Sequence, residues 1–503
     1  MIYIILGILA LIYFITQPLI VVIYFKIKYG KRVIIQYAPM LGLLRTLSQS
    51  RAINGDAFQA LSVLIKNNRQ ADILVTNLLF RPLIVFLKPN YYKIFMQQHE
   101  AYTKFPMIVD KRLVSKGMLM EGGAKWKQQR KLLGAHFEYN KLINLIPMIN
   151  DVAEKKLSGL PNSIFPAMNL ASSITGEVVL RAFFGEDIAK LSLNGQDPSL
   201  CVTQLITRFG QLITESRFFQ IKRALLEEKV FSLFPRKVEK DLFELNTIML
   251  DHMKKAIQGR MEKLKNCKDF VHQDYLDIYL DAYLNKNDQM DPPITEDEIL
   301  QQSITLYFAG TETTANLVTT ACYFLAENPH LQQEIYQEIL EVLNGESIVT
   351  AKHLQNLQKV TGFLMECLRL KPVAPMLISK KALQDVYILD IFIKKGWYVN
   401  YMVLSNAQNQ NYFPNPKQID ITRWKSDGTL KDSTIDPFAF VPFSAGGRNC
   451  IGQYLALIES KIVISKILMK YRLKLNEKLI KTEWIAKITY GLSNQDYITW
   501  EAR

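Results

Sequence analysis

Val441-Pro442-Phe443-Ser444-Ala445-Gly446-Gly447-Arg448-Asn449-Cys450-Ile451-Gly452 carries the strongest signal in this 503-residue chain. Its glycines let the backbone pack tightly around a bulky group, and neighbouring N–H groups can point at an anion. An apolar periodic segment starts at Tyr454, so a helix there would place its positive dipole end on the sulfur and lower the pKa of the thiol. Arg448 adds a fixed positive charge that can pair with a carboxylate or phosphate. The pattern favours a thiolate held as a metal ligand.

The loop resembles the heme-binding loop of cytochromes P450, Phe-x-x-Gly-x-Arg-x-Cys-x-Gly. All five specified positions match, namely Phe443, Gly446, Arg448, Cys450 and Gly452. By this resemblance Cys450 would be the axial thiolate ligand of a non-covalent heme b, and the other four would bind or enclose that heme. A lone cysteine in an apolar chain is more often a small buried hydrophobe, so the conclusion depends on further motifs.

A second motif lies in the helix expected over residues 296–326, which Thr295 opens with a predicted capping box. Gly310 weakens this helix, so we expect that something approaches its backbone closely. A carboxylate beside a hydroxyl, as in Glu312 and Thr313, can relay protons to a reacting oxygen. A polar turn on an ordinary surface helix is the plainer alternative. The segment also resembles the oxygen-activating helix of the same family, which implies that Thr313 steadies the reacting oxygen and Glu312 supports proton delivery.

Residues that would hold the heme propionates come from the same resemblance. Trp126 and Arg130 share one helix face at i, i+4, and the family uses this pair to bind propionates. Where relatives carry a further propionate-binding arginine, this chain has Lys380, which keeps the charge but loses the bidentate geometry. A basic surface helix is the alternative for 126–130. Three lysines and Arg448 would surround the proximal face and attract an acidic reductase: Lys125, Lys127 and Lys131.

Glu366 and Arg369 place opposite charges three residues apart in an apolar helix, so a buried ion pair is expected. The family's Glu-x-x-Arg motif adds a downstream arginine, which Arg423 matches. This trio is assigned to support of the fold and the heme loop. The motif positions also predict an apolar substrate pocket and hence a lipophilic substrate; the residues are Leu306, Phe308, Ala309, Met376, Leu377 and Ile378.

The first 25 residues are expected to form a separate unit. Ile2 to Phe25 contains no charge, and 24 helical residues span roughly 36 Å, enough to cross a bilayer. Basic residues follow at once, from Lys26 to Arg32, which predicts a single-pass signal-anchor with the rest of the chain in the cytosol. A cleaved signal peptide is the alternative, but the run is too long and lacks a basic n-region. By the family resemblance, the membrane is that of the endoplasmic reticulum.

The domain prediction is an anchor over 1–25, a basic, Pro-containing linker over 26–50 and one catalytic domain over 51–503. Helical periodicity covers 140–160, 235–265, 330–343 and 351–370 as well, and strand-like runs are short, so the fold class is mainly α with small β-sheets, the cytochrome P450 fold. Five cysteines without paired spacing argue against disulfides or zinc. The net charge of +14 fits lipid headgroups or an acidic redox partner, since no nucleic-acid-binding signature accompanies it.

The implied activity is that of a heme-thiolate monooxygenase acting on a lipophilic substrate. No flavin or nicotinamide fingerprint appears, so electrons would come from a separate NADPH-dependent cytochrome P450 reductase, with cytochrome b5 as a second candidate donor. Two alternatives stay open: a heme-thiolate isomerase or dehydratase that acts on lipid peroxides, and a non-enzymatic, membrane-anchored heme carrier or gas sensor. The intact Glu312–Thr313 pair argues against both.

Overall fold

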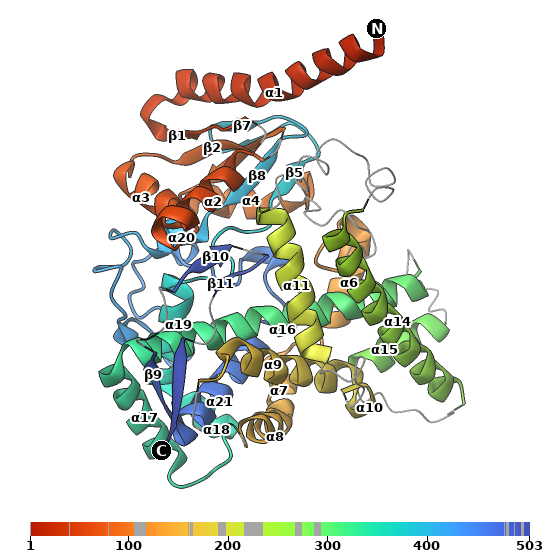
Figure 1. Cartoon of the computed structure of the whole chain (residues 1–503), viewed down its shortest axis with the longest axis vertical. Helices are drawn as coiled ribbons and strands as arrows, with labels where there is room; N and C mark the ends of the chain where they lie inside the picture. The colour runs from red at the N-terminus through yellow and green to blue at the C-terminus, as the bar shows by residue number, and fades with distance from the viewer. Residues whose placement is uncertain are drawn as a thin grey trace.

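The computed structural model describes residues 2–503 except for 40, 79, 105–116, 159, 161–163, 190–197, 216–234, 267–273, 286–292, 477, 479–481, 487 and 494–496. For residues 2–15 and parts of 187–215 it describes the helix but not the side chains. The described residues form a mainly helical protein with one larger and several two-stranded sheets, which confirms the expected class (Figure 1).

The helices before the central one are α1 (Ile2–Tyr29), α2 (Leu43–Asn54), α3 (Gln59–Asn67), α4 (Pro89–Gln97), α6 (Gly123–Gly134), α7 (Tyr139–Leu142), α8 (Ile146–Leu157), α9 (Ala167–Phe184), α10 (Glu186–Ala189), α11 (Pro198–Glu215), α14 (Lys237–Lys265) and α15 (Tyr275–Leu284). The central helix and those after it are α16 (Glu296–Glu327), α17 (Pro329–Leu343), α18 (Ala351–Asn356), α19 (Gln358–Leu370), α20 (Val403–Ala407) and α21 (Gln453–Lys470).

The six-stranded sheet has the order β1-β2-β3-β8-β5-β4. Its strands are β1 (Val33–Gln36), β2 (Ile73–Leu78), β3 (Arg81–Phe86), β4 (Tyr102–Lys104), β5 (Lys380–Ala382) and β8 (Tyr398–Tyr401). The paired strands elsewhere are β6 (Val386–Ile388) with β7 (Ile391–Ile393), β9 (Tyr471–Leu475) with β12 (Ile498–Ala502), and β10 (Trp484–Ala486) with β11 (Tyr490–Leu492). β2 and β3 form an antiparallel hairpin, and β8 joins β3 in parallel, so early and late segments share one sheet.

α16 runs through the middle of the molecule, between the sheet and the helices of the lower half (Figure 1). It starts as predicted, because Thr295 Oγ1 accepts a hydrogen bond from the Glu298 N–H at 3.2 Å. Glu298 does not complete a capping box, since its carboxylate binds Lys125 at 2.6 Å instead. The helix ends at Glu327, with Asn328 as its C-cap before Pro329.

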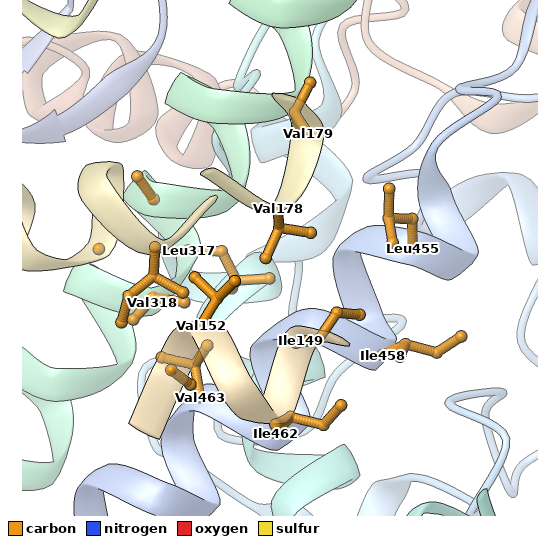
Figure 2. Packing of buried hydrophobic residues seen from close by; sticks show 14 of the residues in the cluster. Ile149, Val152, Val178, Val179, Leu317, Val318, Leu455, Ile458, Ile462 and Val463 are labelled. Carbon is orange, nitrogen blue, oxygen red and sulfur yellow. The ribbon is translucent and has the colours of Figure 1, made fainter. Parts of the chain in front are cut away.

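Four helices enclose the largest core: α8, α9, α16 and α21. Figure 2 shows how their branched side chains interlock; the labelled residues are Ile149, Val152, Val178, Val179, Leu317, Val318, Leu455, Ile458, Ile462 and Val463. This packing fixes α21, and with it the loop that precedes α21, against α16.

Residues 26–50 differ from the predicted linker. α1 continues to Tyr29, β1 pairs with β2 from Val33 to Gln36, and α2 follows from Leu43. Phe25 is fully buried and packs against Trp397 with ring centroids 5.9 Å apart, so the end of α1 belongs to the folded domain. The apolar sequence at the end of α1 is therefore compatible with burial against the sheet as well as with insertion into a lipid bilayer.

Among the residues described with their side chains, which begin at Thr16 in α1, no helix is both long and apolar enough to cross a membrane. Most of the span predicted over residues 1–25 lies outside that set.

Candidate functional site

The cysteine loop is a tight turn that leads into α21. The Cys450 N–H donates to the Phe443 carbonyl at 2.8 Å, and residues Gly446–Arg448 form a 3₁₀ turn between them. Gly446 has a φ of +68°, and Gly452 is the residue that precedes α21. The Ser444 hydroxyl lies 2.8 Å from the Tyr92 hydroxyl, which ties the loop to α4. The loop therefore presents Cys450 from a rigid frame.

Cys450 is accessible, whereas Cys201, Cys322 and Cys367 are buried. The sequence predicts a lowered pKa for the Cys450 thiol, but burial of the thiol in the surrounding protein raises that pKa. The Gly452 N–H and the charges of Arg130 and Lys104 act in the opposite direction. Desolvation outweighs the helix terminus here, and a metal ion bound to the sulfur would supply the missing positive charge, since a coordinating thiol is deprotonated outright.

Arg448, Trp126 and Arg130 meet beside this loop. The Arg448 guanidinium carbon lies 3.7 Å from the centre of the Trp126 ring, and its Nη1 donates to the Glu121 carbonyl at 2.8 Å. Arg130 donates from Nη1 to the Asn449 carbonyl at 2.8 Å and from Nη2 to the Asn449 side chain. α6 thus delivers both predicted residues next to Cys450.

Lys380, on β5, is buried with its Nζ 4.5 Å from the centre of the Phe95 ring. Burial and the charge of Arg448 lower the pKa of Lys380 to about 8. The neighbouring strand adds Lys104, because β4 pairs with β5 and places Lys104 opposite Lys380. Burial and the charges of Arg448, Lys380 and Arg130 lower the pKa of Lys104 to about 7.

Lys104 was missed in the sequence because it lies in no motif, and only the strand pairing reveals it. Among the described residues, no carboxylate lies within ion-pair distance of Lys104, Lys380, Arg130 or Arg448. Buried positive charges are costly unless they are paired. This donor set fits the two propionates of a heme whose iron would be bound by Cys450.

In the segment of α16 predicted to activate oxygen, the solvent-exposed residues lie along one side of the helix, which we call the open stripe. Between Glu298 and Ala326, all of which the structure describes, only Ala309 and Thr313 are exposed. The Thr313 hydroxyl donates to the Ala309 carbonyl at 2.6 Å, so both residues belong to one turn of α16. Ser and Thr side chains in helices commonly bond back to the i−4 carbonyl in this way.

Gly310 is explained by helix packing rather than by approach of a ligand. A Cβ at this position would lie 2.5 Å from Cγ2 of Val179 on α9. The contact allows α9 and α16 to lie closely together, with Val179 placed as in Figure 2. The expectation of a close backbone approach was right, but the neighbour is a second helix.

Glu312 is buried beside Thr313, at 2% exposure, and points to the β10–β11 hairpin. Its Oε1 accepts hydrogen bonds from Asn316 Nδ2 and from Thr489 Oγ1, both at 3.2 Å. The acid and the hydroxyl of the motif therefore occupy different faces of α16. Neither Asn316 nor Thr489 was singled out in the sequence.

The structure brings Glu366, Arg369 and Arg423 together, as the motif implies. Arg369 binds both carboxylate oxygens of Glu366, at 2.8 and 2.7 Å, and both side chains are fully buried. Arg423 Nε lies 3.8 Å from Glu366 Oε1. The remaining Arg369 donors bind three carbonyls, those of Ala407, Pro416 and Gln418.

The predicted pocket residues do not share one environment. Leu306 is buried in the large core, and Phe308 packs against that core. Ala309 is exposed on the open stripe of α16, and Ile378 is partly buried. Met376 pairs with Met402 through an isolated bridge, while Leu377 packs beside the sheet.

The lysines predicted to attract an acidic partner are partly engaged within the protein. Lys125 binds Glu298, and Lys127 binds Glu100 at 2.6 Å on the surface. Lys131 is exposed. Arg448 lies inside the site and does not extend from this surface.

Comparisons with known proteins agree with this geometry. The sequence model of the family described as cytochrome P450 matches residues 52–492. Human cytochrome P450 3A7 is 28% identical over 361 residues, covering 70% of this chain and 68% of that protein. Cytochrome P450 4c21 of Blattella germanica is 28% identical over 374 residues, covering 71% of each. The crystal structure of the cytochrome P450DA heme domain aligns with a TM-score of 0.74 and 19% identity, over 94% of this chain and 97% of that one, a likeness in fold.

Proposed function

Because this chain belongs to the cytochrome P450 family, a family of heme-thiolate monooxygenases, we propose that it inserts one atom of O2 into a lipophilic substrate. The second oxygen atom leaves as water, and the balance requires two protons and two electrons. The observation that best supports this reading is an accessible cysteine in the matched loop beside a group of buried and partly buried cations that have no carboxylate partner among the described residues.

The cofactor of the family is heme b with a cysteine thiolate ligand. When bound, the heme supplies oxygen activation, and its thiolate ligand favours O–O cleavage. Cys450 would ligate the iron within the frame of Phe443, Gly446 and Gly452. Five side chains would hold the propionates: Trp126, Arg130, Arg448, Lys380 and Lys104. Ala309 stands where one lipid-hydroxylating branch carries an ester-linked glutamate, so the heme would be non-covalent.

Proton delivery would fall to Glu312 and Thr313. The Thr313 hydroxyl lies on the exposed side of α16 and donates its hydrogen to the Ala309 carbonyl. It would turn away from that carbonyl to donate a hydrogen bond to a reacting oxygen. Glu312 would take protons up from the buried side of the helix. The trio Glu366, Arg369 and Arg423 would support the segments around the heme loop without taking part in the chemistry.

Proteins of this family work with redox partners and lipophilic substrates. We expect a membrane-bound, NADPH-dependent reductase as electron donor, with exposed lysines such as Lys131 among its contacts. The uncharged run that precedes Lys26 supports a single-pass anchor in the endoplasmic reticulum membrane, with the catalytic domain in the cytosol. A lipophilic substrate would enter from that membrane toward Ala309, Met376 and Ile378.

The first test is the absorbance of the reduced protein with carbon monoxide. A thiolate-type Soret band is expected for the wild type, and Cys450→Ser should lose it while still folding. Absence of the band from folded, heme-loaded protein would overturn the proposal. Fatty acids, sterols and aromatic compounds would then be screened for substrate-induced shifts of the heme spectrum.

The second test is Thr313→Ala in an assay with NADPH and the reductase. A monooxygenase should form less product for each NADPH consumed, because a proton donor near the oxygen is gone. A heme carrier or sensor should show no change. Turnover of a lipid hydroperoxide without NADPH, alongside no NADPH-dependent oxidation, would favour an isomerase or dehydratase instead.

A further inference from the structure

A three-way hydrogen-bond junction surrounds the Glu312 carboxylate. Asn316 Nδ2 lies 3.2 Å from Glu312 Oε1 and 3.0 Å from Thr489 Oγ1, and the Thr489 hydroxyl lies 3.2 Å from the same Glu312 oxygen. Asn316 also donates to the Glu312 carbonyl at 3.0 Å. All three side chains are buried, with exposed fractions of 2%, 5% and 8% for Glu312, Asn316 and Thr489.

The junction joins α16 to the β10–β11 hairpin at close range. A Cβ on Gly491 would lie 1.9 Å from Asn316 Oδ1, so any larger residue at this position would have to displace the Asn316 amide. Figure 1 shows β10 and β11 between the sheet and α16, and β11 contacts α16. The position of the hairpin therefore decides whether Thr489 can reach Glu312.

The next residue fixes the hairpin from its other side. The Tyr490 hydroxyl donates to Asp56 Oδ1 at 2.7 Å, and Lys371 Nζ binds Asp56 Oδ2 at 2.5 Å. Lys371 also lies 3.0 Å from the Tyr490 hydroxyl. Consecutive residues of the hairpin thus bind two separate polar clusters, and this fixes the place of the Thr489 hydroxyl.

We propose that Asn316 and Thr489 are positioning residues that hold the Glu312 carboxylate for proton delivery, and that the β10–β11 hairpin controls this position. The inference rests on the proposed role of Glu312 in delivering protons. Asn316 reaches Glu312 from the following turn of the same helix, an i, i+4 pair that is present whenever α16 is formed. Thr489 comes from a separate element, so its bond is lost whenever the hairpin moves away.

A buried carboxylate held by several donors has a defined orientation, and the loss of one of these donors weakens that hold. A misplaced acid delivers protons more slowly, so reduced oxygen escapes as hydrogen peroxide instead of being cleaved. Formation of H2O2 consumes the same two electrons and two protons from NADPH and solvent but leaves the substrate unchanged. The ratio of peroxide to NADPH therefore reports the position of the acid.

The test compares Thr489→Val, which removes the hydroxyl at nearly constant volume, with Thr489→Ser, which keeps it. Thr319→Val is the matched control. Thr319 is buried on α16, the helix that carries Glu312, but its hydroxyl donates to the Ala315 carbonyl and to Met168 Sδ and not to Glu312. Heme-loaded wild type and variants are assayed with the reductase and a substrate that shifts the heme spectrum. In Thr489→Val we expect the peroxide released per NADPH to rise about three- to tenfold, the effect of losing one hydrogen bond of ordinary strength. Thr489→Ser and Thr319→Val should stay near wild type.

Infrared difference spectra provide a readout that does not depend on turnover. The bands of the Glu312 carboxyl are identified by their loss in Glu312→Gln, and Thr489→Val should shift those bands while Thr489→Ser restores them. A double variant, Thr489→Val with Glu312→Gln, should release no more peroxide than Glu312→Gln alone, because both changes act through one group.

The inference is overturned if Thr489→Val leaves the Glu312 bands or the peroxide ratio unchanged, or if Thr489→Ser fails to restore both. Failure of the proposed function looks different. In that case the wild type itself shows no NADPH-dependent oxidation, while the infrared bands still report whether Thr489 binds Glu312.

Discussion

The lowered pKa values of Lys104 and Lys380 lead to a prediction at the scale of the residue. Propionates would stabilise the charged lysines and raise both pKa values, so each lysine takes up a proton when heme binds. The heme-free values are about 7 for Lys104 and about 8 for Lys380. Ligation releases the Cys450 proton, which favours heme binding as the pH rises. Above its heme-free pKa, we expect each lysine to lower heme affinity by up to about tenfold per pH unit relative to a variant whose charge does not titrate there.

The measurement is a heme titration of heme-free protein at several pH values. Lys104→Arg keeps a charge that is not lost in this range, so its heme affinity relative to the wild type should rise from pH 7 to 9. Lys104→Met should bind heme more weakly than the wild type at low pH, and this difference should shrink as the pH rises. A ratio of Lys104→Arg to wild-type affinity that is constant from pH 6.5 to 9 would contradict the role of Lys104.

The close packing at Gly310 predicts how substitutions there change the free energy of unfolding. Gly310→Ala would press a methyl group against Val179, so we expect the free energy of unfolding to fall by about 1–3 kcal/mol. The matched control is Gly259→Ala on α14, where nothing lies within 4 Å of the new Cβ. That change should raise the unfolding free energy by up to about 1 kcal/mol. Urea unfolding measures both, and Val179→Ala should relieve the loss caused by Gly310→Ala.

Site residues that belong to short sequence motifs could be predicted from the sequence. Site residues that come together only through contacts between distant segments could not. Cys450, Trp126 and Arg130 each belong to short motifs, and the structure places them together. Lys104 and Thr489 are separated from their partners by more than 170 residues, and no local pattern marks them. The raised pKa of Cys450 depends on the surrounding protein, which spacing along the chain does not describe.

At the scale of the element, the segment from 351 to 370 shows how tertiary contacts divide a predicted helix. Periodicity predicts a single helix here, but the structure has α18 and α19 separated at Leu357. Glu338 of α17 fills the break, because its carboxylate accepts hydrogen bonds from the Lys359 and Val360 N–H groups at 2.6 and 2.9 Å. A carboxylate at a helix N-terminus satisfies donors that the helix itself cannot.

Glu338→Ala should therefore lower the free energy of unfolding by about 1–3 kcal/mol, because two buried N–H groups lose their acceptor. The control is Glu334→Ala one turn earlier, which removes an exposed ion pair with Lys359 and should change stability by at most about 1 kcal/mol. Chemical denaturation followed by circular dichroism separates the two. Equal effects of both variants would show that the carboxylate does not act as a cap for α19.

At the scale of the whole molecule, the helical content could be predicted from the sequence, but the sheet could not. The strands of the sheet are short, β4 and β5 are not apolar, and β8, the partner of β3, lies about 300 residues later in the chain. Pairing over such a distance depends on the packed helices between the strands and on no local signal. For the same reason the segment from 26 to 50 resembled a linker, although β1 forms an edge of this sheet.

The last prediction concerns α1, which has one part docked on the sheet and another that we propose enters the membrane. Phe25 is fully buried, whereas Ile27 is 81% exposed on the same helix. Phe25→Ala should lower the free energy of unfolding by about 3–5 kcal/mol, since a large core side chain is lost. Ile27→Ala should change the free energy of unfolding by less than about 0.5 kcal/mol.

Truncation of α1 tests the same division of the helix. A chain lacking residues 1–17 should keep the wild-type unfolding midpoint but bind liposomes less, and one lacking residues 1–29 should lose stability as well. If both truncated chains unfold like the full chain, α1 is not part of the folded domain, because its contacts with the sheet then contribute nothing to stability.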